Sequence, residues 1–207
     1  MHVIDRLMIL AVLGVSYFTS YAQGTYEVNT GSARTGVDVI YSTSIDSIKH
    51  WPVLSRNIAS LYHDQSTSLV SFNSIAYSFK SGLGIASNNI FTPSRFYTAI
   101  GIQYILSRKE VFLYVYLTKE ISSNNFYDHF IFFAWQPHLR KNLKLLLQNE
   151  LNFTLYGFEN DNSLERFKAG LNYANKFQFG LMMEVASSKK SFQVNYENLG
   201  VFIKKII

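Results

Sequence analysis

The fold is decided by residues 143–185, which read LKLLLQNELNFTLYGF, then ENDNS, then LERFKAGLNYANKFQFGLMMEV. Apolar side chains occupy the odd positions from Leu143 to Leu155, with Asn149 as the one break, and again from Phe167 to Tyr173 and from Phe177 to Val185, while polar side chains gather at the even positions. Alternation with a period of two places successive side chains on opposite faces of a β-strand. Asn175 and Lys176 indicate a two-residue hairpin turn. The stretch therefore predicts three consecutive antiparallel strands, each with one apolar and one polar face.

The composition excludes several classes of protein. The chain has 207 residues, which suits a single domain. Charged residues make up 16%, below the roughly 25% that is usual for soluble domains. There is no cysteine, which excludes disulfides and thiolate metal sites. The net charge of +5 comes from scattered residues and short Lys/Arg pairs, so we expect no nucleic-acid partner.

Residues 1–22 have the pattern of a secretory signal peptide. A weakly basic start precedes the apolar run LMILAVLGV at residues 7–15, and the small residues Ser20 and Ala22 precede a cleavage site. This run is too short for a transmembrane helix, which needs about 20 apolar residues. We therefore expect export, cleavage near Ala22 and a single mature domain at residues 23–207. A buried N-terminal helix is the alternative.

The remaining chain is a succession of strand-like blocks of alternating residues, each closed by turn residues. The connections near residues 81, 108, 140 and 175 are short. Those near residues 90, 123, 160 and 190 are longer or more polar. This predicts a barrel with short turns at one end and longer loops at the other. Counting the blocks gives about 10 or about 12 strands.

The orientation of the apolar faces separates a membrane barrel from a soluble sandwich. The blocks reach ten or more residues, as a tilted membrane-spanning strand requires, whereas sandwich strands average nearer 5–6. Aromatic residues at the block ends are typical of the girdles at membrane interfaces. These are Tyr62, Phe96, Tyr97, Phe126, Tyr127, Trp135, Tyr156, Phe158 and Tyr196. We therefore predict an all-β fold, an antiparallel up-and-down transmembrane β-barrel of about 10–12 strands.

Four charged side chains occupy the polar face of the opening stretch. They are Glu150, Arg166, Lys168 and Glu184, on three consecutive strands. Antiparallel pairing would place acid, base and acid side by side, and opposite charges across strands attract. We predict that they form a charge ladder facing the lumen, where they either line the bore or obstruct it. The alternative is a solvated outer face of a sandwich.

The two ends of the chain resemble those of outer-membrane proteins. The predicted signal ends in Tyr-Ala-Gln (residues 21–23), and residues 197–205 read ENLGVFIKK before a terminal Ile207. In this pattern the chain resembles uncharacterised outer-membrane β-barrels of the Bacteroidota type, although many barrels end in an aromatic residue. The resemblance implies a barrel fold in the outer membrane and does not imply an activity.

No motif in the sequence predicts a catalytic, cofactor-binding or metal site. Asp128 and His129 are adjacent, as are His63 and Asp64, but neighbours on a strand point to opposite faces. We therefore expect a non-enzymatic outer-membrane barrel, either a narrow pore or a structural or interaction barrel. The expected partners are outer-membrane lipids, the barrel insertion machinery and small polar solutes. A lipid-modifying enzyme on the same barrel and a soluble periplasmic binding sandwich are the alternatives.

Overall fold

The computed structural model describes residues 23–44, 50–64, 66–122, 126–157, 159–188 and 193–207. The predicted signal peptide at residues 1–22 and its cleavage site lie outside these residues. In the described part of the chain, no helix is long and apolar enough to cross a membrane. Twelve long strands account for most of it: β1 (Gln23–Gly31), β2 (Arg34–Ser44), β3 (Pro52–Tyr62), β4 (Thr67–Ser78), β5 (Leu83–Thr92), β6 (Arg95–Ser107), β7 (Val111–Glu120), β8 (Phe126–Trp135), β10 (Leu143–Tyr156), β11 (Glu159–Tyr173), β12 (Phe177–Ser188) and β13 (Gln193–Ile206).

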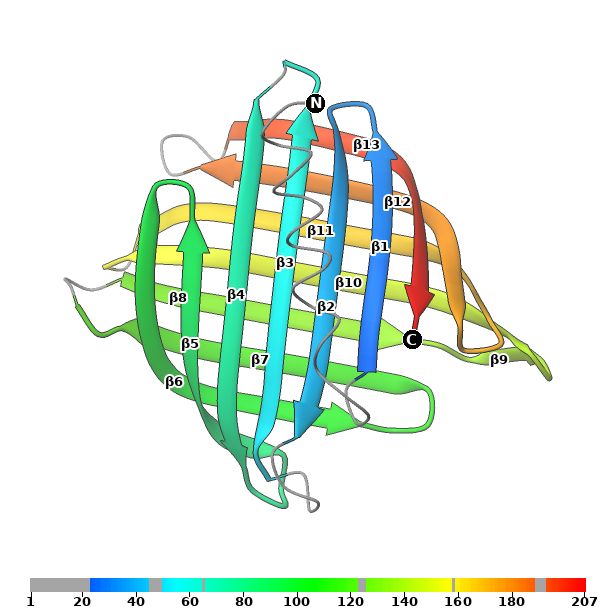
Figure 1. Cartoon of the computed structure of the whole chain (residues 1–207), viewed down its shortest axis with the longest axis horizontal. Coiled ribbons are helices and arrows are strands. Elements are labelled where there is room, and N and C mark those ends of the chain that lie inside the picture. The colour runs from blue at the N-terminus through cyan, green and yellow to red at the C-terminus, as the bar shows by residue number, and fades with distance from the viewer. Residues whose placement is uncertain (1–22, 45–49, 65, 123–125, 158, 189–192) are drawn as a thin grey trace.

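These strands form one closed antiparallel barrel. Each strand pairs with its neighbours in sequence, and β1 pairs with β13 to close the sheet. The short strand β9 (His138–Arg140) pairs with β10 inside the connection from β8. Figure 1 shows the first and last strands side by side, in blue and red. The predicted barrel is confirmed, with twelve strands, and a single closed sheet excludes the two-layered sandwich.

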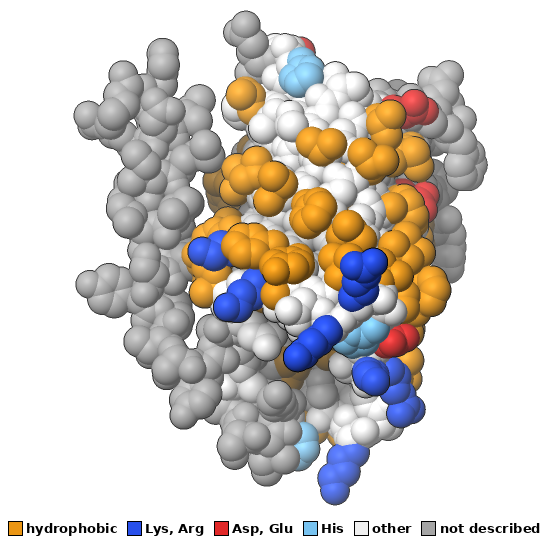
Figure 2. All heavy atoms as spheres, turned by 90° about the vertical axis from the view of Figure 1, so that its right-hand side faces the viewer, with side chains coloured by type: hydrophobic (Ala, Val, Ile, Leu, Met, Phe, Trp, Pro, Cys, Tyr) orange, Lys and Arg blue, Asp and Glu red, His pale blue; other side chains and the backbone are white. Residues whose placement is uncertain are grey.

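Side chains alternate between the lumen and the outer surface. On β10, Leu146, Gln148 and Glu150 are buried inside the barrel. On the outside, Leu181 and Leu199 are 63% and 66% exposed. Figure 2 shows hydrophobic side chains gathered across one face of the barrel, with Lys and Arg side chains below them. An exterior of large apolar side chains around a polar interior is the arrangement expected in lipid.

The predicted loops near residues 90 and 160 are strand. β5 continues to Thr92, so only Pro93 and Ser94 connect it to β6, and β11 begins at Glu159. The predicted difference in connection length between the two ends is therefore wrong. Polar side chains suggested a loop, but Asn88 is fully buried in the lumen. A barrel interior accepts the polar residues that a sandwich would place in loops.

The hairpin between β11 and β12 has its tight turn one residue earlier than predicted. Its central residues are Ala174 and Asn175, both at φ 55°, and the Lys176 N–H donates to the Tyr173 carbonyl oxygen at 3.0 Å. Two successive positive φ values are typical of the type I′ turn, whose twist matches that of the flanking strands.

The aromatic residues predicted to form girdles divide between the outer surface and the lumen. Phe96 and Trp135 are exposed on the outer surface. Tyr97 instead packs inside the barrel against Phe126, with ring centroids 5.7 Å apart. Adjacent aromatic residues on one strand must point to opposite faces, so a pair supplies only one girdle residue. Phe158 lies outside the described residues.

Strands β6 and β7 approach closely at Gly101. A Cβ atom there would overlap the Leu117 carbonyl oxygen and would lie 2.6 Å from the Thr118 Cα atom. Both are backbone atoms, so relief requires the two strands to move apart.

We expect Gly101→Ala to lower the free energy of unfolding by about 1–3 kcal/mol, as overpacking does elsewhere. Urea unfolding in detergent, followed by tryptophan fluorescence, would measure this change. Gly24→Ala is the matched control, because its Cβ atom would meet only the Tyr41 side chain, at 3.1 Å. An equal effect of both substitutions would contradict the steric explanation.

Candidate functional site

Three of the four predicted ladder residues lie opposite one another inside the barrel. Glu150 on β10 is in register with Arg166 on β11, which is in register with Glu184 on β12. The Arg166 Nε donates to Glu184 Oε2 at 2.6 Å, and its Nη1 donates to Glu150 Oε1 at 3.4 Å. The exposed fractions of Glu150, Arg166 and Glu184 are 4%, 1% and 0%. The antiparallel register thus brings acid, base and acid together.

Lys168 has a different partner. In register it lies opposite Gln148 and Met182, which are uncharged. Its Nζ atom binds the carboxylate of Glu27 on β1, with Oε2 at 2.5 Å. The ammonium group also lies 5.1 Å from the ring centroid of Phe202. Lys168 therefore joins β11 to β1 across the lumen.

Three further charged residues, which the sequence did not single out, come from β2 and β3. Arg34 donates two hydrogen bonds to Glu184, at 2.7 and 2.5 Å, although 150 residues separate them in the chain. Arg56 donates to Asp38 at 3.0 Å and binds both carboxylate oxygens of Glu150, at 2.8 and 3.0 Å. The sequence signal for these residues was a charged side chain at a strand position that faces the lumen. The sequence does not show which distant strands face each other across the lumen, so their partners were not predicted.

These eight residues form what we call the lumen network. Its carboxylates are Glu27, Asp38, Glu150 and Glu184, and its cations are Arg34, Arg56, Arg166 and Lys168. The four negative and four positive charges balance. Removing charges from water costs several kcal/mol for each ion, and only close pairing with good hydrogen-bond geometry offsets this cost. The bidentate contacts of Arg34 and Arg56 have such geometry.

Aromatic side chains from β4, β7 and β8 pack together in another part of the lumen. Phe72, Tyr116 and Phe130 stack in a row, with centroid distances of 5.6 and 5.3 Å and interplanar angles of 11° and 18°. Leu54 packs against this aromatic stack, and Arg56 occupies the next lumen-facing position on the same strand. The lumen network and the aromatic stack therefore meet at β3.

A cavity of about 580 Å³, which we call the cup, adjoins one side of the lumen network. It lies toward the end of the barrel where β3 leads to β4, and Arg34, Arg166 and Glu184 contribute to its lining. The other lining side chains include hydroxyl and amide groups, among them Ser60, Ser68, Asn152 and Thr154.

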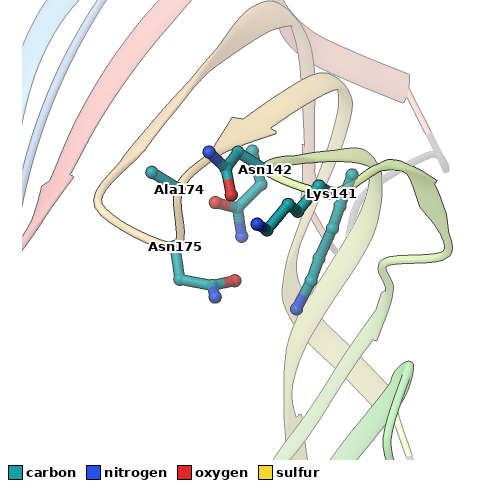
Figure 3. Close-up of a pocket in the computed structure, with 6 residues that line it drawn as sticks. Lys141, Asn142, Ala174 and Asn175 are labelled. Carbon is teal, nitrogen blue, oxygen red and sulfur yellow. The ribbon is translucent and has the colours of Figure 1, made fainter.

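A smaller cavity of about 130 Å³ lies at the opposite end, between two turns. Figure 3 shows Lys141 and Asn142 beside Ala174 and Asn175 of the next turn. The Ala174 N–H donates to the Asn142 carbonyl oxygen at 2.7 Å and holds the turns together. This cavity shares no lining residue with the cup.

Asp128 and His129 lie on opposite faces of β8. Asp128 is buried in the lumen, whereas the His129 ring stacks on Phe153 with centroids 4.4 Å apart. The two side chains therefore do not form an acid–base pair. Within the described residues, no group of three His, Cys, Asp or Glu side chains could hold a metal ion.

No family model matches the chain, and no curated protein matches it in sequence. Its fold is similar to the NanC porin in a rhombohedral crystal form, with a TM-score of 0.54 and 7% identity over 90% of this chain and 99% of that one. It is also similar to the KdgM porin in complex with disordered oligogalacturonate, with a TM-score of 0.50 and 10% identity over 90% and 98%. A third similar structure comes from work on in-meso crystallization of membrane proteins, with a TM-score of 0.51 and 11% identity over 91% and 83%.

The fold and the interior together define the class of the protein. It is a closed twelve-stranded antiparallel barrel with an apolar exterior, and it shares its barrel fold with porins. At such low identity the likeness concerns the fold alone.

The pairing of the network predicts a large effect of neutralising one carboxylate. Glu184→Gln would leave Arg34 and Arg166 with a deficit of negative charge in a buried site. We expect the free energy of unfolding to fall by about 3–5 kcal/mol. Urea unfolding in detergent would measure it.

Two variants serve as controls for this prediction. Glu110→Gln, in the turn between β6 and β7, should change stability by less than about 0.5 kcal/mol. The double variant Arg34→Met/Glu184→Leu removes cation and anion together, so it should cost much less than Glu184→Gln. If Glu184→Gln were as mild as Glu110→Gln, the network would not stabilise the barrel.

Proposed function

We propose that the protein is a non-enzymatic barrel of the outer membrane whose bore is closed at rest. The observation that carries this proposal is the lumen network, in which six charged residues form one series of ion pairs and Lys168 and Glu27 form another pair beside it. The aromatic stack packs in the lumen beside it. A hydrated ion entering this layer would have to break paired, buried charges. The barrel then acts as a structural or interaction element rather than as a steadily open pore.

The proposed location rests on the exterior and on the ends of the chain. Exposed Leu181, Leu199 and Ile203 would contact the hydrocarbon of outer-membrane lipids. The last strand, β13, would be the segment that the barrel insertion machinery recognises. The sequence resemblance to barrels of the Bacteroidota type supports the same location.

The cup gives this closed barrel a place to bind small polar solutes. Its hydroxyl and amide groups suit a solute that carries hydrogen-bonding groups of its own, and the network forms its floor. A solute would enter from the end opposite the start of β1 and the end of β13, and it would stop at Arg34 and Glu184. This arrangement favours binding over passage.

Conductance across a planar lipid bilayer tests the closed bore. We expect the unaltered protein to show no steady current in either sodium or potassium chloride. The double variant Asp38→Ala/Arg56→Ala removes a neutral pair where the network meets the aromatic stack, and it should produce stepwise conductance. Asn149→Ala/Glu165→Ala, which removes a hydrogen-bonded pair from strands β10 and β11, should remain silent. Steady current through the unaltered protein would overturn the proposal.

Labelling of single cysteines tests which parts of the lumen are reachable, because the chain has no cysteine of its own. A bulky maleimide added to whole cells should label Ser68→Cys, which lines the cup. It should not label Gln178→Cys, which is buried inside the barrel near the opposite end. Equal labelling of both positions would indicate a continuous aqueous path.

A further inference from the structure

A row of uncharged polar side chains crosses the outer surface of strands β3 to β6. Ser55 is in register with Asn73, Asn73 with Asn89, and Asn89 with Thr98. All four point away from the lumen, because their neighbours Leu54, Arg56, Phe72, Ser74, Asn88, Ile90, Tyr97 and Ala99 face it. We call these four residues the outer polar row.

Hydrogen bonds link the residues of the row in pairs. The Ser55 Oγ donates to Asn73 Oδ1 at 2.8 Å, and the Thr98 Oγ1 donates to Asn89 Oδ1 at 2.8 Å. Asn57 and Ser71, the next outward positions on β3 and β4, add bonds of 3.4 and 3.2 Å to the row. The row is therefore an ordered feature of the surface.

The outer polar row lies within the apolar band of the barrel. On β4, the outward residues Leu69 and Ile75 flank the polar positions and are 44% and 40% exposed. On β5, Ile85 and Phe91 flank them in the same way. Apolar residues on both sides place the row at the depth of the lipid hydrocarbon and not among the headgroups.

Part of the hydrogen-bonding capacity of the row is unused within the described residues. Asn89 accepts a bond at Oδ1, but its Nδ2 group donates to no described residue. Asn73 donates to Ser71 and keeps a second N–H. Hydrocarbon offers no acceptor, so these donors favour a protein partner at this surface.

Other outward hydrogen bonds, such as that between Asn149 and Glu165, join single pairs, whereas the middle of β12 and β13 is apolar. The outward positions of β12 and β13 include Leu181, Met183, Leu199, Val201 and Ile203, all strongly exposed and apolar. Strands β3 to β6 contain two charged residues, Arg56 and Arg95, and both face the lumen. The outer face of β3 to β6 thus carries the outer polar row among apolar side chains and has no charged side chain.

We propose that the outer polar row is the contact surface for a second copy of this chain in the membrane. An amide carries both donors and an acceptor, so the same row can satisfy itself when two copies meet across a two-fold axis. Because the face carries no charge, two copies meet without repulsion. Hydrogen bonds between such side chains also hold membrane segments together in helical proteins. This inference rests on the proposed membrane location.

Cysteine cross-linking in membranes tests the proposed dimer. Ile75→Cys and Ile85→Cys sit beside the row and leave it intact, and each should give a disulfide-linked dimer on mild oxidation. Leu181→Cys on the opposite side is the control and should stay monomeric. Adding Asn73→Leu and Asn89→Leu to either cysteine variant should abolish the cross-link, and it should shift the native mass in detergent from dimer to monomer.

The experiments distinguish failure of the proposed dimer from failure of the proposed function. Folding is checked by the shift in gel migration between unheated and heated samples, and location by fractionation with the outer membrane. A folded, membrane-bound protein that is monomeric would overturn the dimer alone. Equal cross-linking through Leu181→Cys, or a cross-linked product containing a different protein, would overturn it too. Absence from the membrane fraction would instead overturn the proposed function.

Discussion

The pairing of β1 with β13 is the interaction on which the rest of the structure depends. Backbone N–H and C=O groups have no water partner in the hydrocarbon of a membrane, so a sheet can span it only when its edges are paired. Seven registered residue pairs, from Thr25 with Ile206 to Gly31 with Gly200, close the twelve strands into a ring. Closure separates an inner face from an outer face, and each side chain then belongs to one of them.

Closure also makes the lumen network possible. Arg34 and Glu184 are 150 residues apart in the chain, and Arg56 and Glu150 are 94 apart, yet both pairs bond inside the barrel. Each charge would be costly if buried alone, and it is tolerated because an opposite charge from a distant strand meets it. The network in turn connects β1, β2 and β3 to β10, β11 and β12, so it braces the barrel from inside.

Local alternation was enough to predict the strands, because a period of two follows from the backbone itself. It was also enough to predict the facing of Glu150, Arg166 and Glu184, which lie on consecutive hairpin strands. It gives no facing where both faces of a strand carry apolar residues, as on β7, where Tyr114 and Tyr116 face the lumen and Leu117 faces outward. It failed near Asn88, because a polar residue suits a loop and a barrel interior equally well.

The sequence by itself determined that this chain forms long amphipathic antiparallel strands, since side-chain alternation is a local property of each strand. Only the tertiary structure decided the remaining charge pairs, because the further partners of residues 143–185 come from the first three strands and reach them only when the sheet closes. In that opening stretch, Glu150, Arg166, Lys168 and Glu184 supply half of the network. The network is completed by Glu27, Arg34, Asp38 and Arg56.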